Sequence, residues 1–455
     1  MSLLSKTNKQ PNSSKPNRAM EDKVTTVNEA IMLVQEYFTN PERLGEERAA
    51  RNKAAAESAM SGAKDAKEKA LKLLREFLVE NGVKVQDIVT DVLALEIYKE
   101  IWGLGPLEEI YEDRNVNEIQ INAPDRIYVM RNLKLERLDG VKFRDNDHVM
   151  NFVTRMVMHD RGVSLNRSSP TIESMRKDGT RITATCPPVT EHVTVALRKH
   201  LQRVVPFDEM VRRGVMDTRG ADILRLLVRG RANVAVIGGV GSGKTTLVRT
   251  MCGEIPPNAR IIVIETDREL DLARNYPERN IVEMEEHQEI KRTLKELFRT
   301  VLRYSPVVII VGEFRGEGEA SEAIQACERG HDGSMTTAHF SSPELFVKGT
   351  ARMLIREGLA LPEKTVEEMV ASAFNIVVKM YGDPTRGIMK LESVTELTPG
   401  EPFSCRRLYE WEYIEGDYEK GQWRICGKPS AGLLNRLFKH GVAKAEVDEV
   451  FGRTC

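Results

Sequence analysis

The residues of this chain that point most clearly to chemistry form a glycine-rich run that ends in a lysine and a threonine. The run matches the pattern G-x-x-x-x-G-K-[ST] and consists of Gly238, Gly239, Val240, Gly241, Ser242, Gly243, Lys244 and Thr245, followed by Thr246. Glycines let backbone N–H groups close on phosphate oxygens, the lysine adds positive charge, and the threonine hydroxyl suits Mg²⁺. The run therefore predicts a site for the phosphates of a nucleotide.

The segments on either side of this loop fit the strand–loop–helix context that the motif requires. Residues 232–237 form a short, mainly apolar run, as expected of a buried parallel strand. Residues 246–251 contain neither glycine nor proline and can open a helix. The N-terminus of that helix would then face the bound phosphates.

Two carboxylates follow apolar runs in the same part of the chain. Glu265 comes after Ile261–Ile264, and Glu313 comes after 308–312. Parallel strands gather their carboxyl ends at one edge of a sheet, so both side chains should face the nucleotide and its Mg²⁺. We expect Glu265 to be the general base and Glu313 to join Thr245 around the metal, although the two carboxylates can exchange these roles.

From about residue 221 to 395 the chain alternates between strand-like and helix-like segments, which is typical of a parallel sheet with helices on both faces. The candidate strands are 232–237, 260–265, 307–312, 333–338 and 374–380. His339 directly follows the fourth of these strands, where a histidine is placed to sense the γ-phosphate.

The rest of the chain divides by pattern. Short β-rich runs alternate with one helix near 147–159, typical of an α+β region, and Thr26 with Glu29 can form a capping box at the start of an earlier helical region. Pro206 favours an extended linker before it. The expected parts are a disordered tail at 1–22, a helical extension at 23–100, an α+β domain at 101–203, a linker at 204–220 with a hinge near Pro206, and an α/β domain at 221–455 that ends in a hairpin and a helix from about 400.

The charge and the apolar runs of the sequence indicate which classes of partner the chain can bind. The 455 residues carry a formal net charge of −1, whereas a nucleic-acid-binding domain more often has a strong basic excess, so no direct nucleic-acid contact is expected. The sequence shows neither an apolar signal segment nor an apolar run of the ~18–20 residues that span a bilayer. We therefore expect a cytoplasmic protein.

The stretches around the candidate site resemble the secretion ATPases of the type II/type IV superfamily. Residues 265–270, 312–315 and 330–339 are similar to that family's Asp box, Walker B and His box. The stretches similar to its N-terminal domain are 103–107, 117–122, 125–129, 178–181 and 195–198. Within the superfamily the chain most resembles the tight-adherence pilus motors (CpaF/TadA-like) and the related conjugation ATPases.

The resemblance implies a RecA-like motor domain preceded by a PAS-like α+β domain, assembled as a homo-hexameric ring with ATP bound between the two domains. It implies that Arg181 and Arg198 of the first domain reach the phosphates, and it adds Arg315 of the Walker B stretch to the catalytic residues. The family's His-box histidine and Asp-box glutamate map onto His339 and Glu265.

The expected function is an Mg²⁺-dependent ATPase motor that powers pilus assembly or type II/IV secretion. The chain would work at the cytoplasmic face of the inner membrane through a polytopic platform protein, and would move a pilin or secreted substrate only indirectly. Two alternatives stay open: a RecA-like DNA translocase or conjugation ATPase, and a nucleotide-gated scaffold with little turnover. The scaffold is kept because Thr266 stands where the family usually has aspartate.

Overall fold

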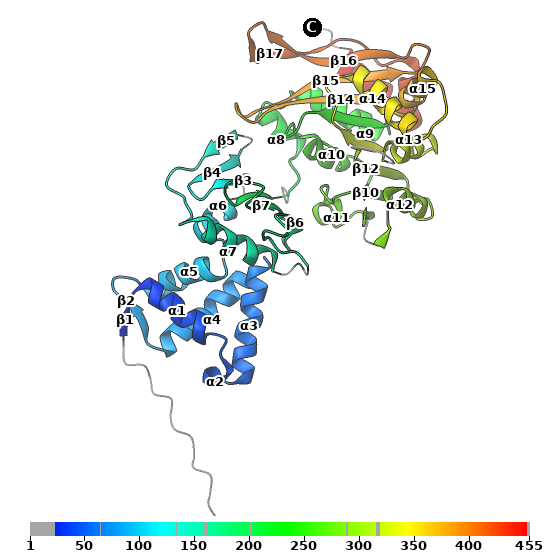
Figure 1. The fold of residues 1–455 in the computed structure, drawn as a ribbon. Helices are drawn as coiled ribbons and strands as arrows, with labels where there is room; N and C mark the ends of the chain where they lie inside the picture. Colours follow the sequence, from blue (N-terminus) through cyan, green and yellow to red (C-terminus); the bar gives the residue numbers. More distant parts are fainter. Residues whose placement is uncertain are drawn as a thin grey trace, which may run out of the picture. The chain divides into compact units, whose positions relative to one another are not determined.

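The chain folds into two units: residues up to 129 together with 137–199, and residues 130–136 together with 200–455. The computed structural model describes residues 23–63, 65–113, 115–132, 134–158, 160, 162–199, 203–287, 290–314 and 319–452 (Figure 1). The tail predicted at 1–22 lies outside these residues. Within the described residues, no helix combines the length and apolar character needed to cross a bilayer.

The first unit begins with a helical extension. Its elements are β1 (Lys23–Thr25), α1 (Val27–Tyr37), α2 (Pro41–Leu44), α3 (Glu46–Met60), α4 (Ala66–Glu80), β2 (Val83–Val85) and α5 (Thr90–Ile101). The predicted capping box is present: Thr26 Oγ1 accepts a bond from Glu29 N at 3.3 Å, and Glu29 Oε2 accepts one from Thr26 N at 2.8 Å. The extension has its own apolar core, where the rings of Phe38 and Trp102 lie 4.8 Å apart.

The α+β part of this unit follows. Its elements are η1 (Gly105–Leu107), α6 (Glu108–Glu112), β3 (Val116–Ala123), β4 (Arg126–Arg131), β5 (Lys134–Arg137), α7 (Asn146–Val157), β6 (Thr171–Met175), β7 (Arg181–Thr185) and β8 (Thr194–Arg198). The strands form one sheet in the order β5-β4-β3-β8-β7-β6, although residues 130–136, which hold the end of β4 and most of β5, are counted with the second unit. Alternate residues such as Ile182 and Leu197 enter its core, so their neighbours project from the other face.

The second unit is the predicted α/β domain. Its helices are α8 (Phe207–Arg212), α9 (Thr218–Arg229), α10 (Lys244–Cys252), α11 (Leu272–Asn275), α12 (Leu294–Val301), α13 (Glu319–Glu328), α14 (Pro343–Arg356), α15 (Glu363–Ala373), α16 (Ala431–Lys439) and α17 (Lys444–Phe451). Its strands are β9 (Val234–Gly238), β10 (Ile261–Glu265), β11 (Ile281–Glu285), β12 (Val308–Phe314), β13 (Met335–Ala338), β14 (Ile376–Asp383), β15 (Ile388–Thr398), β16 (Ser404–Ile414) and β17 (Asp417–Ile425).

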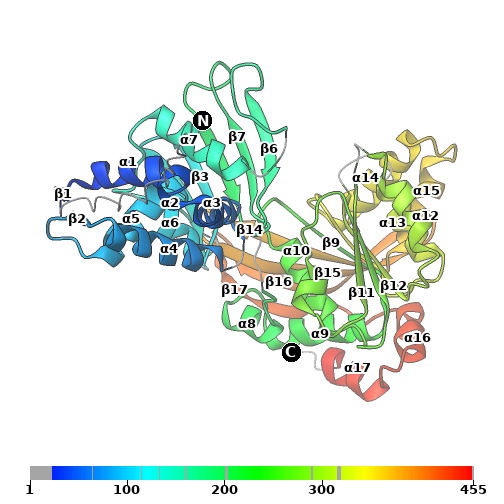
Figure 2. The same ribbon diagram turned by 90° about the horizontal axis from the view of Figure 1, so that it is seen from below.

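These strands form a single sheet in the order β11-β10-β12-β13-β9-β14-β15-β16-β17. The part from β11 to β14 is parallel, and β15 to β17 are antiparallel. Val234 and Val236 of β9 enter one core cluster with α9 and α10, while Ala235 and Ile237 enter a second with α12 to α15. Figure 2 shows these two helical layers on opposite faces of the sheet. The predicted fold class is therefore confirmed.

The segment predicted as a linker at 204–220 needs a correction, because most of it is helical and packed. It contains α8 and the start of α9, and Val205, Phe207 and Met210 are buried in the core of the second unit. Thr250 Oγ1 also donates to Val205 O at 2.7 Å. Pro206 indicates one extended residue before it, but Phe207 and Met210, three residues apart, bury one face of the short helix that follows. Pro206 is therefore the N-cap of a helix of the second unit.

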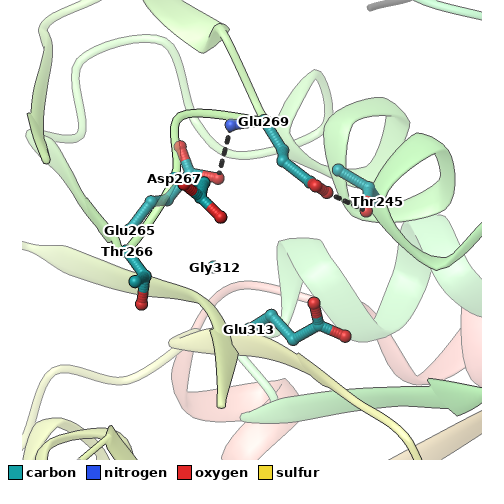
Figure 3. A pocket seen from close by; sticks show the side chains of 7 residues that line it. All are labelled: Thr245, Glu265, Thr266, Asp267, Glu269, Gly312 and Glu313. Atoms are coloured by element: carbon teal, nitrogen blue, oxygen red, sulfur yellow. Dashed lines mark hydrogen bonds between the residues drawn. The ribbon is translucent and has the colours of Figure 1, made fainter. Parts of the chain in front are cut away.

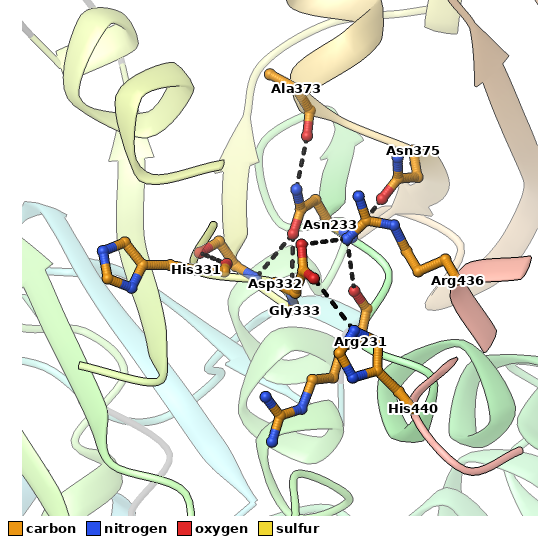
Figure 4. A network of polar contacts seen from close by, with 10 residues as sticks. Arg231, Asn233, His331, Asp332, Gly333, Ala373, Asn375, Arg436 and His440 are labelled. Carbon is orange, nitrogen blue, oxygen red and sulfur yellow. Dashed lines mark hydrogen bonds and ion pairs between the residues drawn. The ribbon is translucent and has the colours of Figure 1, made fainter. Parts of the chain in front are cut away.

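A polar network joins the loop before β13 to the start of β9 and to α16 (Figure 4). Asn233 is 1% exposed, accepts from Gly333 N at 2.9 Å and Ser334 N at 3.2 Å, and donates to Ala373 O at 2.8 Å. Nearby, Asp332 accepts from Arg436 at 2.5 Å and lies 3.1 Å from His440 Nε2. The network fixes the amino end of the strand that leads to His339.

Candidate nucleotide site

The parallel order of the sheet brings the predicted site residues together at one edge. Strands β10, β12, β13 and β9 are consecutive neighbours, and all run in the same direction. Their carboxyl ends lead to Glu265, Glu313, His339 and the glycine-rich loop, respectively. Residues that are far apart in sequence therefore meet where open parallel sheets bind ligands.

The loop itself has the open glycine backbone that a phosphate cradle needs. A Cβ atom added at Gly239 or Gly241 would meet no atom within 4 Å, so the space outside these backbone amides is clear. Lys244 is 7% exposed, and its Nζ donates to the carbonyl oxygens of Gly238 at 3.2 Å and Gly239 at 3.0 Å. Ser242 is fully buried and braces the loop by donating to Gly239 O at 2.8 Å. A phosphate at this loop would meet a preformed cationic cradle.

Lys244, His339 and Glu313 form a line of polar contacts across this edge. The Nζ of Lys244 lies 3.4 Å from Nδ1 of His339, and Nε2 of the same ring lies 2.6 Å from Oε1 of Glu313. The Glu313 side chain is 15% exposed, so water can reach it. This arrangement links Lys244 to the carboxylate of Glu313 through one imidazole ring.

Glu265 has a different environment. It is 4% exposed, and its Oε1 accepts from the backbone N–H groups of Glu269 and Leu270, both at 3.1 Å. Burial raises the pKa of Glu265 to about 8, helped by the charges of Glu283 and Glu269, although the backbone hydrogen bonds oppose the shift. Gly312 packs so closely that an added Cβ would lie 2.6 Å from Glu265 Cγ. Glu265 therefore organises the 265–270 loop.

A cavity between the loop and the two strand ends is lined by Thr245, Glu265, Thr266, Asp267, Glu269, Gly312 and Glu313 (Figure 3). The hydroxyl of Thr245 donates to Oε2 of Glu269 at 3.3 Å. Hydroxyl and carboxylate oxygens are the donors that Mg²⁺ takes from proteins, usually one or two of them together with substrate phosphates. The donor set of this cavity therefore fits an Mg²⁺–nucleotide.

Sequence reasoning missed two contacts that shape this cavity. It did not pair Glu269 with Thr245, and it gave no role to Arg249. Arg249 lies one helical turn after Thr245, is 3% exposed, and donates to Leu270 O at 2.8 Å and Glu269 O at 2.6 Å. An arginine among the apolar residues of α10 was the available signal, because a buried guanidinium needs acceptors.

The structure places the two predicted arginines of the first unit side by side. Arg181 opens β7, Arg198 closes β8, and the two are directly opposite in the antiparallel register. Residues opposite each other in an antiparallel pair project from the same face. Their neighbours Ile182 and Leu197 enter the core, so both arginines lie on the other face of the sheet. Arg315, the third predicted arginine, lies outside the described residues.

Comparison with known proteins identifies relatives. A family model described as "Type II/IV secretion system protein" matches residues 100–379. The type IV secretion system protein PtlH homolog of Bordetella bronchiseptica is 32% identical over 292 residues, which are 58% of this chain and 85% of the relative. The type IV secretion system protein VirB11 of Brucella suis is 28% identical over 314 residues, which are 61% of this chain and 84% of the relative.

Among solved structures, the VirB11 ATPase from the Brucella suis type IV secretion system, in complex with sulphate, is 25% identical with a TM-score of 0.35, and covers 64% of this chain and 93% of that one. The family match spans more than half of the sequence and contains the glycine-rich loop, Glu265, Glu313 and His339. The prediction that, within the superfamily, the chain most resembles the tight-adherence pilus motors remains a prediction. The chain therefore belongs to the type II/IV secretion system protein family of ATPases.

Proposed function

We propose that this chain is an ATP-hydrolysing motor that drives type IV secretion or the assembly of a pilus. The observation that carries the proposal is the line from Lys244 through His339 to Glu313 at the carboxyl edge of the sheet. It joins a group that holds phosphate to a group that can accept a proton, which hydrolysis requires. Family membership supplies the process that the hydrolysis would serve.

In this proposal the loop amides and Lys244 hold the β- and γ-phosphates while water attacks the γ-phosphorus and ADP leaves. We assign the proton of that water to Glu313, which is partly exposed and lies 2.6 Å from Nε2 of His339. The buried Glu265, whose pKa burial raises to about 8, would instead hold the 265–270 loop. This assignment takes up one half of the exchange that the sequence left open, with Glu313 as the base, and gives Glu265 no place around the metal.

Mg²⁺ would be held by Thr245 and Glu269, the two cavity residues that already share a hydrogen bond. When bound, the ion neutralises charge on the phosphate oxygens. Arg181 and Arg198 would add positive charge from the first unit, within one subunit or from a neighbour, and Arg315 is kept as a further candidate. The roles of the arginines follow the sequence prediction, whereas Glu269 takes the place beside Thr245 that the sequence analysis assigned to Glu313.

The proposal includes a homo-hexameric ring, a polytopic platform protein in the cytoplasmic membrane, and a position at the cytoplasmic face of that membrane. The relatives are named as type IV secretion system proteins, which supports a secretion role without naming a cargo. Pilin and secreted proteins are therefore both kept as indirect substrates. No direct contact with nucleic acid is proposed, since the net charge is −1.

Phosphate release by the purified full chain tests the proposal against its two alternatives. A secretion motor should hydrolyse ATP without DNA, and lipid vesicles should change its rate more than DNA does. A DNA translocase should need DNA and lose activity steeply with salt. A scaffold should bind ATP yet release phosphate no faster than a Lys244→Ala control. Either of the last two results would overturn the motor assignment.

A further inference from the structure

The turn that leads into Arg181 is tied down by side chains of the first unit. Thr180 O accepts from Arg176 N at 2.9 Å, closing a tight turn between β6 and β7. The hydroxyl of Tyr111 reaches this turn and donates to Asp178 Oδ2 at 2.5 Å, and it also lies 2.5 Å from Thr180 Oγ1. Thr180 is 3% exposed. The residue immediately before Arg181 is therefore buried and held.

Arg176 holds the same turn from the other side. We call the group formed by Tyr111, Arg176, Asp178 and Thr180 the clamp. It is 7% exposed, its guanidinium lies 5.6 Å from the centre of the Tyr111 ring, and its Nε lies 3.6 Å from Asp178 Oδ2. A buried arginine in contact with an aromatic ring and a carboxylate resists displacement, because moving it breaks both contacts at once. The position of the turn thus depends on Arg176.

The helical extension touches the clamp at the end of α3. Lys177 N donates to Ser61 O at 3.2 Å, across 116 residues of sequence. The next residue, Gly62, leaves room for the guanidinium: an added Cβ would lie 2.7 Å from Nη2 and 2.9 Å from Nε of Arg176. An alanine at 62 would therefore displace the guanidinium of Arg176, in addition to straining a backbone whose φ is +72°.

A second contact joins the extension to the same clamp through α6. Lys67 of α4 donates to Glu108 Oε1 at 2.7 Å and also pairs with Glu112, so it holds both ends of the helix that carries Tyr111. Glu108 is 5% exposed and its Oε2 accepts from Leu104 N at 2.8 Å, which fixes α6 to the preceding turn. The extension thus contacts the clamp directly at Gly62 and indirectly at Tyr111.

We propose that the helical extension is a brace that positions Arg181, with Arg176, Tyr111 and Gly62 as positioning residues that act through the 176–180 turn. The inference rests on the proposed function, in which Arg181 reaches the phosphates of ATP. A charge supplied in the transition state is worth about 10³–10⁵ in rate, and small misplacements of such groups cost about 10²-fold. A force on the extension would then change the rate of hydrolysis.

Two glycines of the extension give a matched test. Gly62 and Gly45 both have positive φ, +72° and +81°, but Gly45 also has a ψ of 154°, a conformation that almost only glycine adopts, so Gly45→Ala imposes at least as much backbone strain as Gly62→Ala. Only the alanine at 62 meets Arg176, since nothing lies within 4 Å of the Cβ at 45. We expect Gly62→Ala to lower kcat for ATP by about 10- to 100-fold with KM unchanged, and Gly45→Ala to keep the wild-type value.

The loss of kcat in Gly62→Ala should depend on Arg181. In an Arg181→Ala background, Gly62→Ala and Arg176→Ala should each change kcat less than about twofold, because the group they position is gone. Arg176→Lys should lie between Arg176→Ala and wild type, since it keeps the charge but loses the planar fork. Equal losses with and without Arg181 would overturn the brace, because a general structural defect does not depend on one arginine.

Amide hydrogen exchange separates this inference from the proposed function. Exchange at residues 177–182 should be faster in Gly62→Ala and Arg176→Ala than in wild type and Gly45→Ala, whether or not the chain hydrolyses ATP. Unchanged exchange would refute the brace even if the wild type is an active ATPase. Absence of hydrolysis in the wild type would refute the proposed function instead. If Gly62→Ala fails to fold, Tyr111→Phe, which removes a single hydroxyl, provides the same comparison.

Discussion

At the scale of single residues, two glutamates that look equivalent in sequence have different environments. Both lie at the carboxyl ends of apolar strands at the same edge of the sheet, but Glu265 is buried and accepts from backbone amides, while Glu313 is partly exposed and lies 2.6 Å from His339 Nε2. Burial disfavours the charged form of a carboxyl group, so the pKa of Glu265 rises to about 8. The two residues should therefore respond differently to substitution.

We expect Glu313→Gln to lower kcat by about 10²–10⁴, because it removes the proton acceptor while keeping the shape of the side chain. Glu265→Gln, which mimics the protonated carboxyl, should keep kcat within about tenfold of the wild-type value. The kcat/KM of the wild type should show no rise centred near pH 8. Rates measured from pH 6 to 9.5 decide this. A rise near pH 8 that disappears in Glu265→Gln would return the role of base to Glu265.

The same pKa shift predicts a dependence of stability on pH. The pKa of Glu265 is raised from its ordinary value of 4.5 to about 8, so between these values the folded chain keeps a proton that the unfolded chain has released. The group therefore lowers the free energy of unfolding as pH rises through this window, by up to about 1.4 kcal/mol per pH unit. Glu265→Gln should lack that loss. Urea unfolding at pH 6 and pH 8.5 should show the variant gaining on wild type at the higher pH, and a constant difference would contradict the shift.

At the scale of elements, the polar network at the amino end of β13 should contribute strongly to stability (Figure 4). Asn233→Ala would leave the buried amides of Gly333 and Ser334 and the carbonyl of Ala373 without their side-chain partner. An unsatisfied buried polar group costs about 1–3 kcal/mol, so we expect a loss of about 3 kcal/mol or more in urea unfolding. Asn435→Ala on the exposed side of α16 is the control and should cost little. Equal stability of the two variants would show that the network is dispensable.

The elements also show what the sequence could predict and why the rest escaped it. Strands β9, β10 and β12 were predicted because their apolar runs are buried on both faces. Strand β15 was missed because its buried side includes Ser393, Thr395 and Glu396, whose polar character hides the strand pattern. The carboxylate of Glu396 accepts from Ser430 N at 2.9 Å, a contact across 34 residues that only the fold creates.

The site follows the same rule. Glu265, Glu313 and His339 could be predicted because each lies at or just after the carboxyl end of a core strand, and parallel strands collect their carboxyl ends at one edge of the sheet. The hydrogen bond from Thr245 to Glu269 and the buried Arg249 could not be predicted, because both depend on how the 265–270 loop turns back over α10. The local sequence pattern therefore identifies the edge of the sheet that carries the site, while the geometry of the loops decides which carboxylate accepts the proton and which one holds the metal.

At the scale of the whole molecule, the proposed ring is a prediction about mass. In the presence of ATP or a non-hydrolysable analogue, the full chain should sediment at roughly six times its 51.4 kDa mass.

Arg181→Ala should leave the chain folded and able to bind nucleotide while lowering kcat, since the charge of Arg181 is needed in the transition state. A chain that stays monomeric under all nucleotide conditions yet hydrolyses ATP at full rate would contradict the ring.

The most direct test of the account is ATP hydrolysis by a Lys244→Ala variant beside a Lys364→Ala control, whose side chain is 76% exposed and lies on α15. Lys244 Nζ contacts both the glycine-rich loop and His339, so its loss should lower phosphate release by about 10²-fold or more and weaken ATP binding, with unfolding by urea little changed. The control should match wild type. Wild-type hydrolysis by a folded Lys244→Ala variant would show that the nucleotide is not processed at this loop, and the central claim would fail.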